Sequence, residues 1–252
     1  MNLMSLKVTA FSVHLIVGFL ILSAVYAYVR YNWFPGGLFE LENVWSGLKI
    51  LLIVDLVLGP LLTFIVYNPK KSSLKFDLTV IVLIQSLALA YGCYVISEQR
   101  PAIITFVGDR FEIITFSEGL HQNLSSRAKD TGAPPFITYA LPAQTEEEKS
   151  KFIIDNYQYK YEAVRHKPID QFIAVLSKAK LDMSNFKFAS AEKEAGFQTF
   201  ISSHQDKNFA LFALEGTRNV AIVIAIDLDK KRVLEYLEID PWVEYLPSMN
   251  NT

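Results

Sequence analysis

This chain has little charge in its first third and only one cysteine. Of its 252 residues, the first 96 carry six of the 24 lysines and arginines and four of the 26 aspartates and glutamates. The remainder carries the other 18 and 22, which is the composition of an ordinary soluble domain. The single cysteine, Cys93, falls in the apolar part, so the polar part has no disulfide and no thiol chemistry. The sequence therefore divides into a lipid-like region and a globular one.

The sequence also lacks the patterns of common catalytic and metal sites. Its four histidines, His14, His121, His166 and His204, are not spaced as zinc ligands are. It contains no phosphate-binding G-x-x-x-x-G-K-[ST], no G-x-G-x-x-G and no G-x-S-x-G. A net charge of −2 argues against a nucleic-acid surface. We therefore expect no enzymatic role, no cofactor, no metal and no nucleic-acid partner.

Three apolar windows are long enough to cross a bilayer, whose ~30 Å hydrocarbon core needs about 20 helical residues. They predict three transmembrane helices, over about 8–29, 49–67 and 78–97. The second window holds one acid, Asp55, and the first and third windows hold none. A cleaved signal peptide is the alternative for the first window, but its apolar run exceeds the usual ~7–15 residues. The expected organisation is a membrane region over 1–97 and a second domain over 98–252.

Lysines indicate the orientation of these helices. Lys70, Lys71 and Lys75 gather in the short loop after the second helix, and loops rich in lysine and arginine stay in the cytoplasm. This places the N-terminus in the cytoplasm and the C-terminal domain on the other side of the membrane. The opposite orientation is the alternative, and it would export the lysine-rich loop.

The C-terminal domain is predicted to be α+β, with helices on one face of an antiparallel sheet. A hairpin is expected over 102–116, and a three-stranded meander over 209–239. The run Val220–Ile226 is continuously apolar and should be the central, most buried strand. Helices are expected to begin near Thr145, Pro168 and Ser190, where capping residues or a first-turn proline occur. The polar stretch 120–136 is expected to be a loop.

Small and polar residues share one face of each predicted transmembrane helix. They recur at helical spacing as Asp55, Gly59 and Thr63; Ala10, His14 and Gly18; and Gln85, Ala88 and Gly92. Close helix packing in lipid uses such faces. Pro60 removes a backbone donor and clashes with the carbonyl four residues back, which predicts a kink. A rise of ~1.5 Å per residue puts His14 and Gln85 level with Pro60, so we expect them to bond the backbone groups that it frees.

Asp55 is the one ionisable acid inside a predicted helix. Charging a carboxyl at that depth costs about 2.5 kcal/mol or more, so the group is neutral, paired or functional. Proteolysis by paired intramembrane aspartates is disfavoured, because no second acid and no G-x-G-D sequence accompany Asp55. Two interpretations stay open. The polar faces only hold three helices together, or Asp55 and the kinked face form a docking groove for another transmembrane helix.

Two stretches of the sequence resemble a known family. They are DLVLGPLLTFIVYNPKKSSLKFDL, followed by Gln85 and a Tyr-Gly pair in the third helix, and EQRPAIITFVGDRFE after it. They are similar to the TfpX/TfpZ accessory proteins of type IV pilins, and the resemblance covers nearly the whole chain, including VAIVIAIDLDKKRVLEYLEIDPW. The positions that match are Asp55, Gly59, Pro60, Lys71, Asp77, Gln85, Gly92, Arg100 and Pro101, none with an established family role. Arg100-Pro101 is expected to be a rigid joint between membrane and domain.

The resemblance implies an accessory protein of the bacterial inner membrane with a periplasmic C-terminal domain. Its implied partners are a cognate major type IV pilin, inner-membrane components of pilus assembly, and membrane lipid. It would influence assembly of the pilin into pili or retraction from them, and hence fimbrium biogenesis and twitching motility, without an enzymatic role. The alternative is an envelope receptor or sensor whose periplasmic domain binds a ligand or a cell-wall component. The short cytoplasmic segments disfavour that alternative, since a receptor needs an output.

Overall fold

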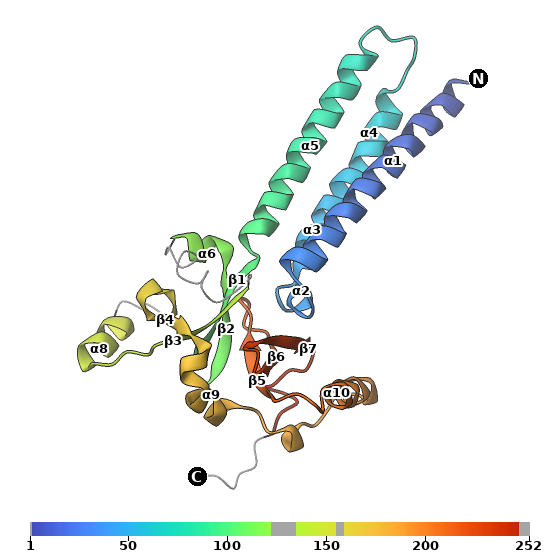
Figure 1. The fold of residues 1–252 in the computed structure, drawn as a ribbon. Coiled ribbons are helices and arrows are strands. Elements are labelled where there is room, and N and C mark those ends of the chain that lie inside the picture. The colour runs from blue at the N-terminus through green and yellow to red at the C-terminus, as the bar shows by residue number, and fades with distance from the viewer. Residues whose placement is uncertain (1, 122–134, 155–158, 247–252) are drawn as a thin grey trace. The chain divides into compact units, whose positions relative to one another are not determined.

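The computed structural model describes residues 2–121, 135–154 and 159–246 (Figure 1). The chain separates into two compact units. One contains residues 1–35 and 43–98 and is helical; the other contains residues 36–42 and 99–252 and is α+β. The fold class is therefore the expected one, a three-helix membrane region and a soluble domain. The segment 36–42 was expected to be part of a loop of the membrane region, but it packs into the α+β unit.

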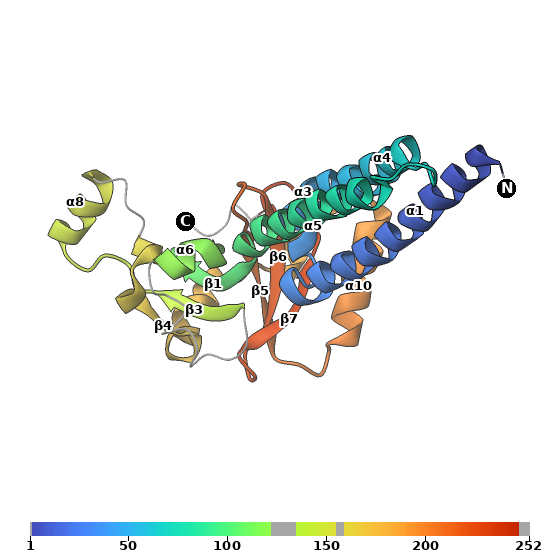
Figure 2. The ribbon, with the colours of Figure 1, turned by 90° about the horizontal axis from the view of Figure 1, so that it is seen from above.

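The helical unit contains three helices that are long and apolar enough to cross a membrane, and each begins before its predicted start. The first is α1 (Leu3–Tyr28), continued by the π-helical turn η1 (Val29–Trp33). The second is built from α3 (Val44–Leu52), the π-helical turn η2 (Ile53–Leu58) and α4 (Gly59–Val66). The third is α5 (Leu74–Glu98). Figures 1 and 2 show α1, α4 and α5 running alongside one another, with α4 in packing contact with both α1 and α5.

The predicted irregularity at Pro60 takes the form of a π-helical turn just before it. The amide of Gly59 bonds to the carbonyl of Val54, five residues back, instead of four. Proline cannot donate to the helical ladder, and a π-helical turn re-registers the hydrogen bonds beside it. The wide turn also contains Asp55, so the acid sits on the irregular part of the central helix.

The α+β unit is built on one seven-stranded sheet with the order β4-β3-β1-β2-β5-β6-β7. The strands are β1 (Pro101–Val107), β2 (Arg110–Thr115), β3 (Phe136–Ala140), β4 (His166–Pro168), β5 (Phe209–Glu215), β6 (Ala221–Asp227) and β7 (Arg232–Leu237). The hairpin and the meander are antiparallel as predicted, but β1–β3 and β2–β5 are parallel pairs, so the sheet is mixed. The prediction of a purely antiparallel sheet is wrong in this respect. Parallel strands are joined by long crossover connections, and the local sequence pattern does not show which distant strands will pair.

The helices of this unit include three that follow the predicted order, one with a shifted start, and one, α6, that was not predicted. They are α6 (Phe116–His121), α8 (Glu146–Ile154), α9 (Ile173–Ala179) and α10 (Ala191–Ser203), with short 3-10 turns at Tyr159–Tyr161, Ala163–Arg165, Ile169–Phe172 and Met183–Asn185. Pro168 ends β4, where it pairs with Thr138 at the edge of the sheet, and it caps the 3-10 turn Ile169–Phe172, so the predicted helix start takes a 3-10 form before α9 begins at Ile173. Edge strands tolerate proline because one side needs no donor. Most of the predicted loop 120–136 lies outside the described residues.

Strand β6 is buried along its whole length, as its apolar run predicts. On one face, Phe197 and Phe200 of α10 join Val223 in a hydrophobic cluster. Side chains alternate between faces along a strand, so Ile222 points the other way. There Gly37 of segment 36–42 lies so close that a methyl group on it would be 3.3 Å from Ile222 Cδ1. The second face of β6, the middle strand of the meander, is therefore covered by segment 36–42, which contains the short helix α2 (Leu38–Leu41).

A buried carboxylate fastens that segment to the sheet. Glu42 is 5% exposed and accepts hydrogen bonds from the backbone amide and the hydroxyl of Thr217, which lies between β5 and β6. Burial raises the pKa of Glu42, although the two hydrogen bonds from Thr217 act in the opposite direction. The segment is thus held both by apolar packing and by a specific polar contact.

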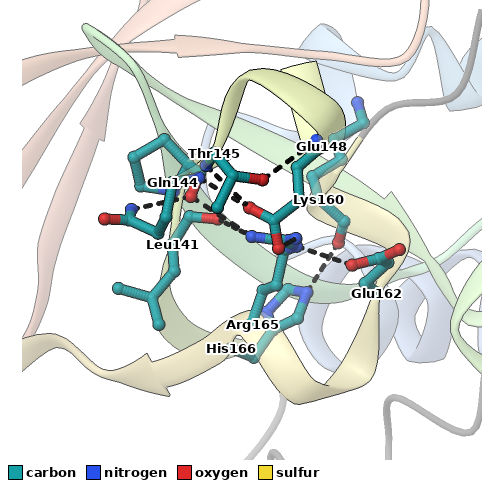
Figure 3. Close-up of polar contacts among 9 residues, drawn as sticks. Leu141, Gln144, Thr145, Glu148, Lys160, Glu162, Arg165 and His166 are labelled. Carbon is teal, nitrogen blue, oxygen red and sulfur yellow. Dashed lines mark hydrogen bonds and ion pairs between the residues drawn. The ribbon is translucent and has the colours of Figure 1, made fainter. Parts of the chain in front are cut away.

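A second polar network, around Arg165, fixes the start of α8 (Figure 3). The Arg165 guanidinium donates to Glu162 at 2.6 Å and to Glu148 at 2.9 Å, and also to the carbonyls of Leu141 and Pro142. Glu148 in turn accepts from the amide of Thr145, whose hydroxyl accepts from the Glu148 amide. This is a capping box, and it confirms the predicted helix start near Thr145.

Candidate helix-docking groove

A groove of about 540 Å³ runs along the helical unit. Its walls are α1 and α5, and its floor is the central helix where η2 and α4 meet. On α1 the lining extends from Leu6 to Ile21, and on α5 from Leu78 to Leu89. At 1.5 Å per residue these stretches are about 22 Å and 17 Å long. The groove therefore follows the helices through much of the thickness of a membrane.

Polar side chains gather in the middle of this otherwise apolar groove. His14 from α1, Asp55 and Thr63 from the central helix, and Gln85 from α5 all line it. His14 Nδ1 lies 2.7 Å from Thr63 Oγ1, and the amide of Gln85 is a hydrogen-bond partner of the Asp55 carboxyl. His14 also interacts electrostatically with Asp55. The structure thus brings together four of the predicted site residues from three helices.

Two of the predicted glycines make this arrangement possible. A methyl group on Gly59 would lie 1.8 Å from Gln85 Nε2, so the absence of a side chain there lets Gln85 cross to Asp55. A methyl group on Gly18 would lie 3.3 Å from the Asp55 carbonyl oxygen, so α1 approaches the backbone of η2 closely. Small residues at helix contacts in lipid allow this kind of approach.

The expectation that His14 and Gln85 bond backbone groups freed by Pro60 is wrong. Both meet side chains of the central helix instead, Thr63 and Asp55 respectively. The π-helical turn has already rearranged the backbone hydrogen bonds next to the proline. Pro60 itself is buried in the central helix. Its effect on the groove is indirect, through the shape of the floor.

Gly92 belongs to a different helix contact. A methyl group there would lie 2.3 Å from Leu51 Cδ2, so Gly92 allows α3 and α5 to pack together. It does not line the groove. The residues that sequence reasoning missed on α5 are Val82, Ser86 and Leu89, which line the wall with Gln85. Val82 and Leu89 lie three and four residues from Gln85 on the same helix face, which was a usable signal, whereas Ser86 is simply its neighbour in sequence.

The remaining predicted residues lie outside the groove. Lys70, Lys71 and Lys75 are exposed in and beside the short connection between α4 and α5, where Lys71 Nζ lies 2.5 Å from Asp77 Oδ2. Two residues separate α5 from β1. One of them, Arg100, places its guanidinium 3.5 Å from the centre of the Phe116 ring, and its carbonyl accepts from the Phe116 amide. Pro101 begins β1.

Within the described residues, no cluster of three histidine, cysteine or acidic side chains could hold a metal ion. The groove offers shape and a few hydrogen-bonding groups in an apolar setting. These are the means by which helices recognise one another in lipid.

Comparison with known proteins gives distant relatives only. No family model and no solved structure matches the chain. Three fimbrial assembly proteins of Dichelobacter nodosus are similar to it. Those of serogroups E1 and I are 27% and 26% identical over 136 residues, which is 52% of this chain and 52% of each relative. That of serogroups C1 and C2 is 28% identical over 108 residues, 41% of this chain and 80% of the relative.

The aligned part of this chain thus spans about half the length of the first two relatives. Their names agree with the broader part of the resemblance seen in the sequence, which is to proteins of fimbrial assembly. They do not identify the TfpX/TfpZ family. The similarity is therefore to fimbrial assembly proteins over about half of this chain, and the described residues include three helices long and apolar enough to cross a membrane.

Proposed function

We propose that this chain is an inner-membrane accessory factor that binds a cognate type IV pilin and modulates its assembly into pili or its retraction from them. The observation that carries the proposal is the groove between α1 and α5, which is open, elongated and lined by apolar side chains around a polar centre. The fimbrial assembly relatives support the process in which it acts. The role is not enzymatic, and the partner held in the groove is the transmembrane helix of the pilin.

The proposed orientation follows from the lysines. With Lys70, Lys71 and Lys75 in the cytoplasm, the N-terminus is also cytoplasmic and the α+β unit is periplasmic. A pilin that waits in the membrane before assembly would meet the groove with its apolar helix. The envelope-receptor alternative stays a prediction, without an observation that favours it.

Photo-crosslinking in cells that express the major pilin tests the docking part of the proposal. A photoreactive residue at Val13 or Val82 sits in the groove wall, at side chains that are 56% and 57% exposed. Matched control positions are Ile16 and Ile84, which are 59% and 60% exposed on the same helices but do not line the groove. We expect adducts with the pilin from the groove positions and few from the controls. Equal adducts from both sets, or none from the groove, would contradict docking there.

A deletion strain tests the process. We expect loss or change of surface pili and of twitching motility, restored by the wild-type chain. Normal piliation and motility in the deletion strain, with the native pilin present, would refute the proposed function.

A further inference from the structure

Most polar groups of the groove lie in its middle part, although Thr9 and Tyr67 also line it nearer one end. His14 is near the middle of the lining stretch of α1, and Gln85 is near the middle of that of α5. The ends of both walls are apolar, with Leu6, Ile21 and Leu89 among them. An occupant that fits this groove must therefore be apolar along most of its length and polar in its central part.

The central groups have hydrogen-bonding capacity left over. A neutral histidine has one donor nitrogen and one acceptor nitrogen. Nδ1 of His14 is engaged with Thr63, while Nε2 has no hydrogen-bond partner among the described residues. The Asp55 carboxyl, which can accept several hydrogen bonds, has the amide of Gln85 as its hydrogen-bond partner there, beside its electrostatic interaction with His14. A donor-or-acceptor nitrogen and an acceptor carboxyl thus face the same groove.

The membrane restricts what can occupy such a site. Within the hydrocarbon core, an occupant is an acyl chain or a segment whose backbone hydrogen bonds are satisfied internally, which for a single segment means a helix. An acyl chain would fill the apolar ends but would leave the central polar groups without partners, which is unfavourable in an apolar medium. A helix with one polar side chain satisfies both parts of the lining.

We infer that the groove takes a single apolar helix that presents one side chain able both to donate and to accept hydrogen bonds, such as a hydroxyl or an amide, to His14 and Asp55. This rests on the proposed function, in which the helix belongs to a pilin. The helix needs about 11–15 residues to follow the lining stretches at 1.5 Å per residue. The polar side chain sets the register of the helix along the groove.

A double-mutant cycle in membranes tests this recognition, with full-length chain and full-length pilin. On this chain, Asp55→Leu removes the acceptor and Asp55→Asn keeps hydrogen-bonding capacity; His14→Phe and His14→Gln form a second such pair. On the pilin, each hydroxyl or amide side chain of the transmembrane helix is replaced in turn by alanine. Binding is measured by the yield of photo-crosslinks from Val82, with thermal unfolding in detergent as a check that each variant folds.

We expect Asp55→Leu to weaken pilin binding about 3- to 20-fold, the range of single interhelical hydrogen bonds in membranes. One pilin replacement should weaken binding similarly, and the double variant should be no weaker than either single one. Asp55→Asn and His14→Gln should retain most of the binding. If Asp55→Leu and His14→Phe both fold and crosslink the pilin as well as the wild type, the polar recognition is wrong while docking stands. Fully additive effects in the cycle would also overturn it.

Two further outcomes separate this inference from the proposed function. Adducts with lipid alone from Val82 would mean that an acyl chain occupies the groove, and both proposals would fail. Adducts with the pilin that do not depend on any polar side chain of its helix would leave the proposed function intact and remove the inference. Since the Asn and Gln variants are close in shape to the originals, a failure of the Leu or Phe variant to fold does not block the test.

Discussion

The attachment of segment 36–42 to the sheet gives a sharp test of the fold, through Glu42. Replacement by alanine removes the acceptor of two hydrogen bonds and leaves the amide and the hydroxyl of Thr217 without that partner. Hydrogen bonds to charged groups contribute about 1.5–3 kcal/mol each. Because burial of the carboxyl is itself unfavourable, the net loss should be nearer to one such bond than to two. We expect Glu42→Ala to destabilise the α+β unit by about 1.5–3 kcal/mol.

For a unit of this size, 1 kcal/mol corresponds to roughly 2–4 °C in Tm. Glu42→Ala should therefore lower the Tm by roughly 3–12 °C, measured by circular dichroism on the full-length protein in detergent. Glu40→Ala is the matched control, because Glu40 lies in α2, which Glu42 caps, and is exposed. If both variants unfold at the same temperature, the reasoning about Glu42 and Thr217 is refuted.

The pH dependence of this contact has a defined sign. The pKa of Glu42 is raised in the folded state, first of all by burial. A raised acid pKa means that the contribution of the group is fully present below its unfolded value, near 4.5, and is lost as the pH rises through the folded value. Glu42→Gln cannot ionise. We therefore expect its stability relative to the wild type to increase with pH over this range, and a constant difference would contradict the assignment.

Three other changes test packing and charge. Gly92→Leu should destabilise the helical unit by about 1–3 kcal/mol through overpacking, because a methyl group there already meets Leu51 Cδ2 at 2.3 Å; unchanged thermal unfolding in detergent would contradict this. Phe212→Ala should cost about 3–5 kcal/mol in urea unfolding, since the side chain is fully buried among other aromatic rings. Burial opposes the ionisation of Glu244, yet hydrogen bonds from Lys193 and two backbone amides hold its pKa below the usual value. Its stabilising contribution is present above the unfolded pKa and lost as the pH falls through the folded one, so Glu244→Gln should flatten the acid side of the stability profile.

The local sequence pattern was sufficient to predict an element where the partners of its residues lie close in sequence, or where a strand is buried on both faces. The apolar run of β6, the hairpin of β1 and β2 and the capping box at Thr145 all follow from such patterns. The spacing of Asp55, Gly59 and Thr63 also placed these residues on one helix face, and all three are buried.

Distant contacts account for what the sequence did not reveal. Strand β3 is only five residues long and pairs in parallel with β1 across a long connection, and its first residue fell within the predicted loop 120–136. The burial of segment 36–42 depends on Ile222 and Tyr236, which are nearly 200 residues away. Counting residues placed His14 at the right depth but did not distinguish a backbone carbonyl from the hydroxyl of Thr63. The π-helical turn determined which of the two His14 contacts, and apart from the proline nothing in the local sequence indicates such a turn.

The energetics of Asp55 provide a last test that separates packing from docking. An aspartate near the centre of a membrane helix costs about 2.5–3.5 kcal/mol on insertion scales, whereas an interhelical hydrogen bond returns about 0.6 kcal/mol on average and at most about 2. The contact with Gln85 is therefore too weak to offset the cost within this chain, and glycines alone would suffice for close packing. We expect Asp55→Leu to raise the Tm of the isolated protein in detergent while it lowers crosslinking to the pilin. If the substitution instead lowers both, Asp55 holds the three helices together, and the groove loses the polar group on which recognition of a fourth helix depends.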